Sequence, residues 1–137
     1  MEPLAAIWLI CSDVERSVVW YRDVLGLTQL EGEHFDAGGI RISLHPRMQE
    51  DDLPPRGSFL VFIVEDVDGR YEELHGRGVE FAGPPAEEPF GRAVELRDPD
   101  GHALWLWQLP DEDDPRCARV EPHARHYEKL IARVGTR

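Results

Sequence analysis

An internal repeat is the feature of this sequence that most constrains its fold. A shift of 53 residues places Asp13 on Asp66, and a valine follows each aspartate. A short apolar run precedes each aspartate, at 5–11 and at 58–64, and a helical pattern follows it. Self-similarity at a fixed period is the signature of a repeated supersecondary unit. The chain is therefore predicted to contain two modules of one kind.

Each copy is predicted to begin as a strand and to continue as a helix. The apolar runs are too short for helices and have the length of strands. The aspartate after each run is a typical N-cap residue, and apolar side chains spaced by three and four follow it. The first helix is predicted to stop at Gly26 and the second at Gly76 or Gly78, because glycine is common just past a helix end.

Three further strands are predicted to complete each copy. The extended segments are 28–37 and 39–45 in the first copy, and 79–82 and 92–108 in the second. Within the last segment, Asp98-Pro99-Asp100-Gly101 predicts the turn that joins the final two strands. Each copy is thus a β-α-β-β-β module.

The predicted fold class is α+β, with two tandem β-α-β-β-β modules whose curved mixed sheets surround a cleft, plus a C-terminal helix. Residues 1–110 form one domain, divided into module one at 4–47, a linker at 48–57 and module two at 58–109. An acidic linker and the helix occupy 111–137. An apolar stripe on this helix is expected to dock on the body or across a dimer interface. The stripe consists of Tyr127, Leu130, Ile131 and Val134.

The charge of the chain excludes some partners. Twenty-seven acidic and 15 basic residues give a formal net charge of −12. Such a field repels phosphate backbones and anionic membranes and attracts cationic ligands. No apolar run approaches the ~18 residues of a membrane span, and the N-terminus lacks the features of a signal peptide. We expect a cytoplasmic protein in which Cys11 and Cys117 are free thiols, with no nucleic-acid or membrane partner.

Two longer motifs resemble a known family. The segment 13–17, Asp-Val-Glu-Arg-Ser, is followed at 20–27 by Trp-Tyr-Arg-Asp-Val-Leu-Gly-Leu, and 90–102 reads Phe-Gly-Arg-Ala-Val-Glu-Leu-Arg-Asp-Pro-Asp-Gly-His. Both resemble the vicinal oxygen chelate superfamily, which includes glyoxalase I, bleomycin resistance proteins and extradiol dioxygenases. The resemblance covers residues 4–109 and implies the paired-module fold.

The resemblance also marks where metal ligands would stand. Enzymes of this superfamily hold a divalent metal with His, Glu or Gln side chains on equivalent strands. The matching positions here are Ala6, Ser43, Ser58 or Phe59, and Trp105. Apart from a weak serine hydroxyl, none of these is a normal ligand for a hard or borderline cation. We therefore expect no metal cofactor, with a divalent metal as the alternative if the register is misplaced.

Strand alternation predicts which side chains line the cleft, since every second residue of a strand shares a face. Three of the four tryptophans fall on the predicted lining. Such rings can stack on a ligand or simply fill a core, and the sequence favours the binding surface. The predicted ligand-binding residues are Trp8, Ile10, Arg41, Ser43, His45, Phe59, Val61, Arg92, Trp105 and Trp107. Four other histidines are expected to be exposed, namely His75, His102, His123 and His126.

Two functional classes remain. The chain resembles most the metal-free, bleomycin-resistance-like branch, whose members are acidic dimers that bind an antibiotic without changing it. This resemblance implies a homodimer that sequesters an aromatic or cationic antibiotic-like compound, as in drug resistance. The alternative is a lyase, isomerase or dioxygenase, either metal-dependent or with His45 or Glu95 as a metal-free base.

Overall fold

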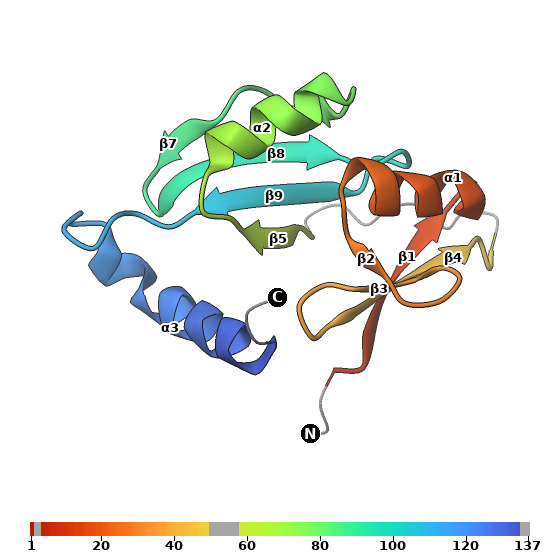
Figure 1. Cartoon of the computed structure of the whole chain (residues 1–137), viewed down its shortest axis with the longest axis horizontal. Helices are drawn as coiled ribbons and strands as arrows, with labels where there is room; N and C mark the ends of the chain where they lie inside the picture. Colours follow the sequence, from red (N-terminus) through yellow and green to blue (C-terminus); the bar gives the residue numbers. More distant parts are fainter. Residues whose placement is uncertain (2–3, 50–57, 135–137) are drawn as a thin grey trace. The chain divides into compact units, whose positions relative to one another are not determined.

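The computed structural model describes residues 1, 4–49 and 58–134 and contains two β-sheets (Figure 1). The chain divides into two compact units. The first consists of residues 1–58 together with 98–102, and the second contains the remaining residues. Residues 50–57 of the predicted linker lie outside the described residues.

The first sheet comes entirely from the first module. Its strands have the order β1-β4-β3-β2, in which β1 and β4 are parallel and the other pairs are antiparallel. The helix α1 runs on into a π-helical segment, η1, that ends just before Gly26, as predicted. The elements are β1 (Ala6–Cys11), α1 (Val14–Val19), η1 (Trp20–Val24), β2 (Thr28–Gln29), β3 (His34–Asp36) and β4 (Arg41–Pro46).

The second sheet repeats this topology. Its order is β5-β9-β8-β6, with β5 parallel to β9, and an additional short strand, β7, pairs with β8. The module was predicted with three strands after its helix and has four, because residues 82–85, Ala-Gly-Pro-Pro, separate β6 from β7. The elements are β5 (Leu60–Ile63), α2 (Val67–Gly76), β6 (Glu80–Phe81), β7 (Ala86–Glu88), β8 (Gly91–Arg97) and β9 (Ala103–Gln108).

The two predicted helix caps are confirmed. The Asp13 carboxylate accepts a hydrogen bond from the Arg16 amide at 3.1 Å, and the Asp66 carboxylate accepts one from the Gly69 amide at 3.0 Å. Each bond satisfies an amide that has no partner within its own helix. The fold class, α+β with two mixed sheets and a C-terminal helix, is confirmed as well.

The core of the first unit contains an unexpected polar cluster. The fully buried Tyr21 donates its hydroxyl to the Asp98 carboxylate at 2.7 Å. Burial and the neighbouring Asp98 raise the pKa of Tyr21, so its hydroxyl stays protonated and can donate. His102 was predicted to be exposed, but it is buried, and its Nε2 lies 2.8 Å from the Ile10 carbonyl oxygen. The physical reason is that the imidazole pairs with this backbone carbonyl when it is buried.

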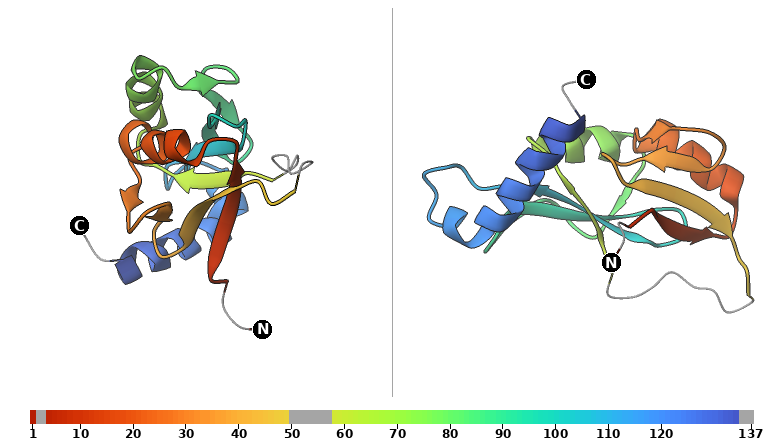
Figure 2. Two further views of the ribbon diagram at one scale, coloured as in Figure 1. Left: turned by 90° about the vertical axis from the view of Figure 1, so that its right-hand side faces the viewer. Right: turned by 90° about the horizontal axis from the view of Figure 1, so that it is seen from below.

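The second unit has a helix on each face of its sheet. In both Figures 1 and 2, α2 and α3 (Cys117–Val134) lie on opposite sides of β8 and β9. The α2 side is apolar and buried, and it contains Val67, Leu74, Val94, Leu96, Leu104 and Leu106. The backbone amide of Val67 also donates to the Gln108 side chain at 2.9 Å, which fixes the start of α2 against β9.

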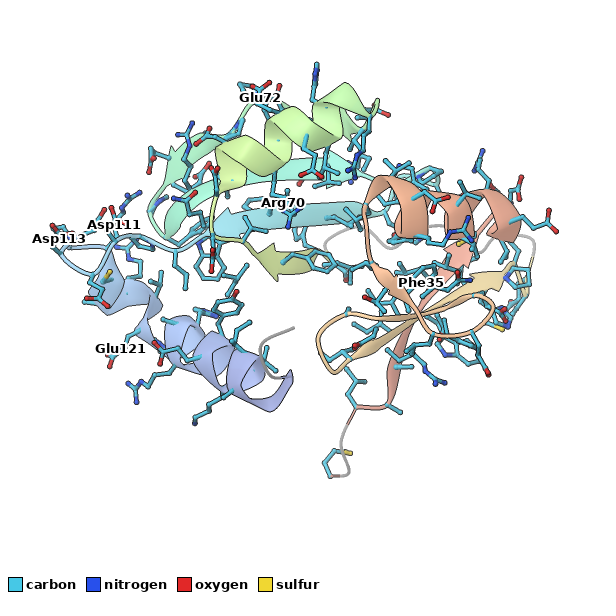
Figure 3. The ribbon with its side chains drawn as sticks, in the orientation of Figure 1. Phe35, Arg70, Glu72, Asp111, Asp113 and Glu121 are labelled. Atoms are coloured by element: carbon cyan, nitrogen blue, oxygen red, sulfur yellow. The ribbon has the colours of Figure 1, made fainter. Side chains whose placement is uncertain are left out.

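The predicted stripe of the C-terminal helix α3 is partly buried, and the most buried residue of the helix lies outside it. Val120 is its most buried side chain, whereas Tyr127 and Leu130 are half-buried and Ile131 is exposed. Glu121 points away from the sheet (Figure 3). Although α3 has 18 residues, no helix in the described part of the chain is both long and apolar enough to cross a membrane.

Both cysteines are free thiols, as predicted. Cys11 is buried in the first unit, and burial raises the pKa of its thiol even though a hydrogen bond from Ser17 opposes the rise. Cys117 opens α3, and its Sγ lies 2.6 Å from the Asp111 carbonyl oxygen. A protonated, buried thiol is a weak nucleophile, so Cys11 is a packing residue.

Candidate ligand pocket

An apolar pocket lies between the second sheet and α3. Its volume is about 380 Å³, within the usual range for small-molecule sites. The sheet contributes aromatic and aliphatic side chains, and α3 contributes the only charged one among the lining residues. The pocket, called the α3 pocket below, is lined by Phe59, Val61, Phe90, Trp105, Trp107, Arg119, Val120 and His123.

Strand register explains why these side chains share one face. In the parallel pair, Val61 stands beside Trp105 and Ile63 beside Trp107. Since residues two apart on a strand point the same way, both tryptophans project to the side opposite α2. Phe59 directly precedes β5 and adds its ring to the same face.

The aromatic rings of the pocket hold one another in place. Phe59 contacts Trp105 edge to face, with ring centroids 5.4 Å apart. Phe90 lies 6.0 Å from Trp105 and 5.6 Å from Trp107, again by ring centroids. Offset and edge-to-face pairs of this kind contribute ~0.5–1.5 kcal/mol each beyond burial. The wall is therefore set before any ligand arrives.

Hydrogen bonds fix the two indoles further. Trp107 donates its Nε1–H to the Phe90 carbonyl at 2.9 Å. Trp105 donates its Nε1–H to one Glu95 oxygen at 2.8 Å, while Arg97 donates to the other at 2.8 Å. Because both indole N–H groups already have protein acceptors, the tryptophans offer a ligand only their ring surfaces.

Gly91 allows this close packing. Its φ of +133° lies in a region that side chains rarely adopt, and a Cβ there would meet the Gln108 carbonyl oxygen and, at 2.9 Å, Trp107 Nε1. Glycine lets the backbone of β8 approach the Trp107 ring. The Phe90-Gly91 pair is thus a structural requirement of the aromatic wall.

The helix α3 closes one side of the pocket. Two side chains of the helix pack inward. Val120 is buried, and the His123 ring contacts Trp107 edge to face, with ring centroids 5.3 Å apart. Arg119 and His123 are four residues apart and so lie on the same face of the helix. His123 was predicted as an exposed residue of the tail; it is exposed, but it also packs on the aromatic wall.

Five of the predicted ligand-binding residues belong to the first unit instead. They occupy the sheet face opposite α1 and are Trp8, Ile10, Arg41, Ser43 and His45. Trp8 stacks on His45 with centroids 4.8 Å apart and planes 7° apart, and it remains 57% exposed. Ser43 Oγ lies 2.7 Å from His34 Nδ1. A cleft shared by the two modules stays a prediction.

Arg92 is placed differently from the prediction. It lies on the α2 side of β8, because its register partner is Gln108 and not a tryptophan. Its guanidinium forms two 2.8 Å hydrogen bonds with the Asp68 carboxylate and one of 3.3 Å with Glu87. The hydrogen bonds from Arg92 lower the pKa of Asp68. Arg92 therefore anchors α2 and does not line the pocket.

The donor groups at the four inferred metal positions do not fit a metal ion. Ala6 offers a methyl group, and Phe59 and Trp105 offer rings whose only polar atom, the Trp105 Nε1–H, is a donor. The Ser43 hydroxyl is engaged by His34. Among residues 1, 4–49 and 58–134, no group of three His, Cys, Asp or Glu side chains could hold a metal ion.

Four lining residues escaped the sequence-based prediction: Phe90, Arg119, Val120 and His123. Phe90 precedes its strand, so alternation did not cover it. The other three lie on α3, and the local sequence of a helix does not predict which face of a sheet the helix will cover. The spacing of Arg119, Val120 and His123 does mark one helix face, which is the one signal that could have grouped them.

Fold and site together define a class: a paired-module α+β protein with an aromatic pocket on one of its sheets. Residues 4–106 match the Glyoxalase/Bleomycin resistance protein/Dioxygenase superfamily, and the chain belongs to this superfamily. YraH of Bacillus subtilis (strain 168), an uncharacterised protein, is 30% identical over 125 residues, which cover 77% of this chain and 98% of YraH.

Solved structures agree with this assignment. A member of the same superfamily from Sphaerobacter thermophilus is 28% identical and has a TM-score of 0.64, over 79% of this chain and 98% of that one. A protein of unknown function from Agrobacterium tumefaciens is 27% identical and has a TM-score of 0.66, over 80% of this chain and 96% of the other.

Proposed function

We propose that this protein is a metal-independent binding protein that sequesters an aromatic, antibiotic-like small molecule in the α3 pocket without changing it. The observation that carries the proposal is the pre-built aromatic wall: Phe59, Phe90 and the two tryptophans contact one another in fixed geometry beside a volume of about 380 Å³. A wall that is already ordered loses little side-chain entropy when a ligand stacks on it.

The polar groups near the wall support binding over catalysis. Glu95, the carboxylate suggested above as a metal-free base, has both of its oxygens engaged, one by Trp105 and one by Arg97. A general base needs an oxygen within reach of the proton it removes. The donor groups at the superfamily's metal positions offer no replacement. Sequestration by stacking needs neither a base nor a metal. It is also compatible with the homodimer that the resemblance to bleomycin-resistance-like proteins implies.

Fluorescence titration tests the proposal directly. The purified full-length chain is titrated with a panel of planar aromatic compounds, antibiotics included, while tryptophan emission is followed. We expect saturable quenching, unchanged ligand on recovery by mass spectrometry, and a loss of about tenfold or more in affinity for Trp105→Leu. Trp20→Phe is the matched control, because Trp20 lies on η1 in the first unit and outside the pocket.

Two outcomes would overturn the proposal. The first is a stoichiometric metal whose removal abolishes ligand binding or abolishes a catalytic activity. The second is turnover of any panel compound that binds with saturable quenching. A metal requirement would contradict a metal-independent site, and turnover would show that the protein is an enzyme.

A further inference from the structure

We propose that the α3 pocket selects an aromatic anion, and that Arg119 and His123 bind its negatively charged group. This inference rests on the proposed function and names its ligand class. It starts from the polar groups among the lining residues. Five side chains from the sheet and Val120 from α3 are apolar or aromatic, and no carboxylate is among the lining residues.

The indole donors are not available to the ligand. Trp107 Nε1 is bonded to the Phe90 carbonyl and Trp105 Nε1 to the Glu95 carboxylate. A polar group on a stacked ligand would lose hydrogen bonds to water unless another donor replaced them. Among the lining residues, the remaining side-chain donors are the Arg119 guanidinium and the His123 imidazole.

Arg119 is available to such a group, because no described residue forms an ion pair with it. Its neighbours along the chain differ: Arg116 pairs with Glu87 and Asp114, each at 2.8 Å, and Arg125 pairs with Glu121 at 2.9 Å. Arg119 thus has no carboxylate partner among the described residues, although it lies at the edge of an apolar pocket.

The spacing of the two donors suits one small anion. Residues four apart on a helix have Cβ atoms about 6 Å apart and project from the same face. The His123 ring rests edge-on against Trp107, so a group bound between the two donors is adjacent to the aromatic wall. A carboxylate, sulfonate or phenolate at the edge of a fused ring system fits this arrangement, since guanidinium donates to such oxygens by charge-assisted bonds.

The net charge of −12 favours a cationic ligand only at long range. Such a field changes how often a ligand arrives, whereas contacts in the site decide how long it stays. An arriving cation could interact with the ring faces, but no carboxylate is among the lining residues to neutralise it, and the positive charge of Arg119 would repel it. The local chemistry therefore favours an anion over the cation that the composition suggested.

Two dyes with one aromatic skeleton test this inference. 1-Anilinonaphthalene-8-sulfonate carries a sulfonate, and N-phenyl-1-naphthylamine is the same skeleton without it. We expect the full-length protein to bind the sulfonate dye about tenfold more tightly, and Arg119→Gln to remove most of that difference while leaving the neutral dye within about twofold. His123→Ala is expected to weaken the sulfonate dye about threefold.

Matched variants keep the outcomes distinct. Arg125→Gln removes an equivalent charge from the same helix at an exposed, ion-paired position and should leave both dyes unchanged. Trp105→Leu should weaken both dyes, which places them in the α3 pocket.

Each failure has one meaning. If both dyes bind equally and Arg119→Gln changes neither, the anion inference is overturned while the binding function stands. If the two charge variants weaken the sulfonate dye equally, Arg119 has no specific role and the inference also fails. If neither dye binds, or if Trp105→Leu has no effect on either, the anion inference is overturned; the proposed function fails with it only if the panel of aromatic compounds also gives no saturable quenching.

Discussion

The two modules share one topology but present different chemistry on corresponding sheet faces. Opposite α1, the first sheet carries the stacked pair Trp8 and His45 and the hydrogen-bonded pair Ser43 and His34. Opposite α2, the second sheet carries an aromatic cluster with α3 packed beside it. One tryptophan in the first sheet is 57% exposed, whereas Trp107 in the second is 8% exposed.

This difference shows how one fold can hold unlike sites. The backbone pairing is equivalent in both sheets, so the topology does not decide what either face binds. The second face becomes a pocket because an additional helix supplies a second wall and the donors Arg119 and His123. We therefore expect the function of this protein to depend on the side chains of one strand face and on the segment that covers it.

The helix-covered faces also differ, and the first unit is again the more polar of the two. In the first unit the core includes Tyr21, Asp98 and His102, joined by hydrogen bonds, and Asp100 accepts from Ser12. In the second unit α2 packs through apolar and aromatic contacts, including Tyr71 against Phe81 at 4.7 Å between ring centroids. The first module therefore has its polar network in the core, and the second has its aromatic network in the pocket. Four changes test this contrast.

The largest expected effect separates the tryptophans of the two faces. Trp107→Ala should lower the free energy of unfolding by about 3–5 kcal/mol, because it removes a buried ring and its contacts with Phe90 and His123. Trp8→Ala, at an exposed position, should cost less than about 1 kcal/mol. Urea unfolding of both variants measures the difference. Equal losses would mean that the two faces are packed alike.

The next effect concerns the close approach beside Trp107. Gly91→Ala should cost about 2–3 kcal/mol, because alanine is strained at a φ of +133° and its Cβ would meet backbone and ring atoms. Gly83→Ala is the control, since a Cβ there has no atom within 4 Å, and it should change stability by less than about 0.5 kcal/mol. Thermal unfolding compares them. A neutral Gly91→Ala would show that the aromatic wall tolerates displacement of β8.

A smaller effect is expected in the polar core of the first unit. Tyr21→Phe should lower stability by about 1–2 kcal/mol, because the buried Asp98 carboxylate loses a 2.7 Å hydrogen bond. Tyr71→Phe in the second unit is the counterpart: its hydroxyl has no hydrogen bond to a described residue, and the loss should be close to zero. If both variants were neutral in denaturant titrations, the polar core would contribute nothing to stability.

The smallest effect is the acid sensitivity of Asp100. Burial pushes the pKa of this carboxyl upward, but hydrogen bonds from Ser12 and the charge of Arg16 outweigh burial, so the pKa of Asp100 is lowered from its ordinary value. The resulting stability is present above the unfolded value of about pH 4 and is lost as pH falls through the lowered folded value.

Asp100→Asn should therefore be less stable than the wild type at neutral pH, and the difference should shrink as the pH falls below the ordinary aspartate value of about 4. Thermal unfolding across that range measures the two curves. A difference that stays constant with pH would show that the Asp100 charge plays no part.

Local signals in the sequence predicted much of the fold. The repeat, the caps at Asp13 and Asp66 and the turn at 98–101 are encoded by neighbouring residues, so each could be predicted without knowing the rest of the chain. Alternation along β5 and β9 likewise placed Val61, Trp105 and Trp107 on one face. Periodicity within a strand depends only on the pleat, which is why these predictions hold.

Other features depended on how elements meet. Arg92 was predicted to line the cleft and instead pairs with Asp68, because the register of β8 against β9 decides which face each residue joins. His102 is buried because its turn belongs to the first unit and its ring meets the Ile10 carbonyl. Neither contact is local in sequence, so no spacing rule could reveal it.

The sequence by itself determined two repeated modules, their helix caps, an acidic surface and an aromatic strand face. Only the tertiary structure decided that α3 covers the second sheet and brings Arg119 and His123 to the aromatic wall. The physical reason is one of range. Strand and helix patterns arise from contacts a few residues apart, whereas the docking of a helix depends on side chains far away in the chain.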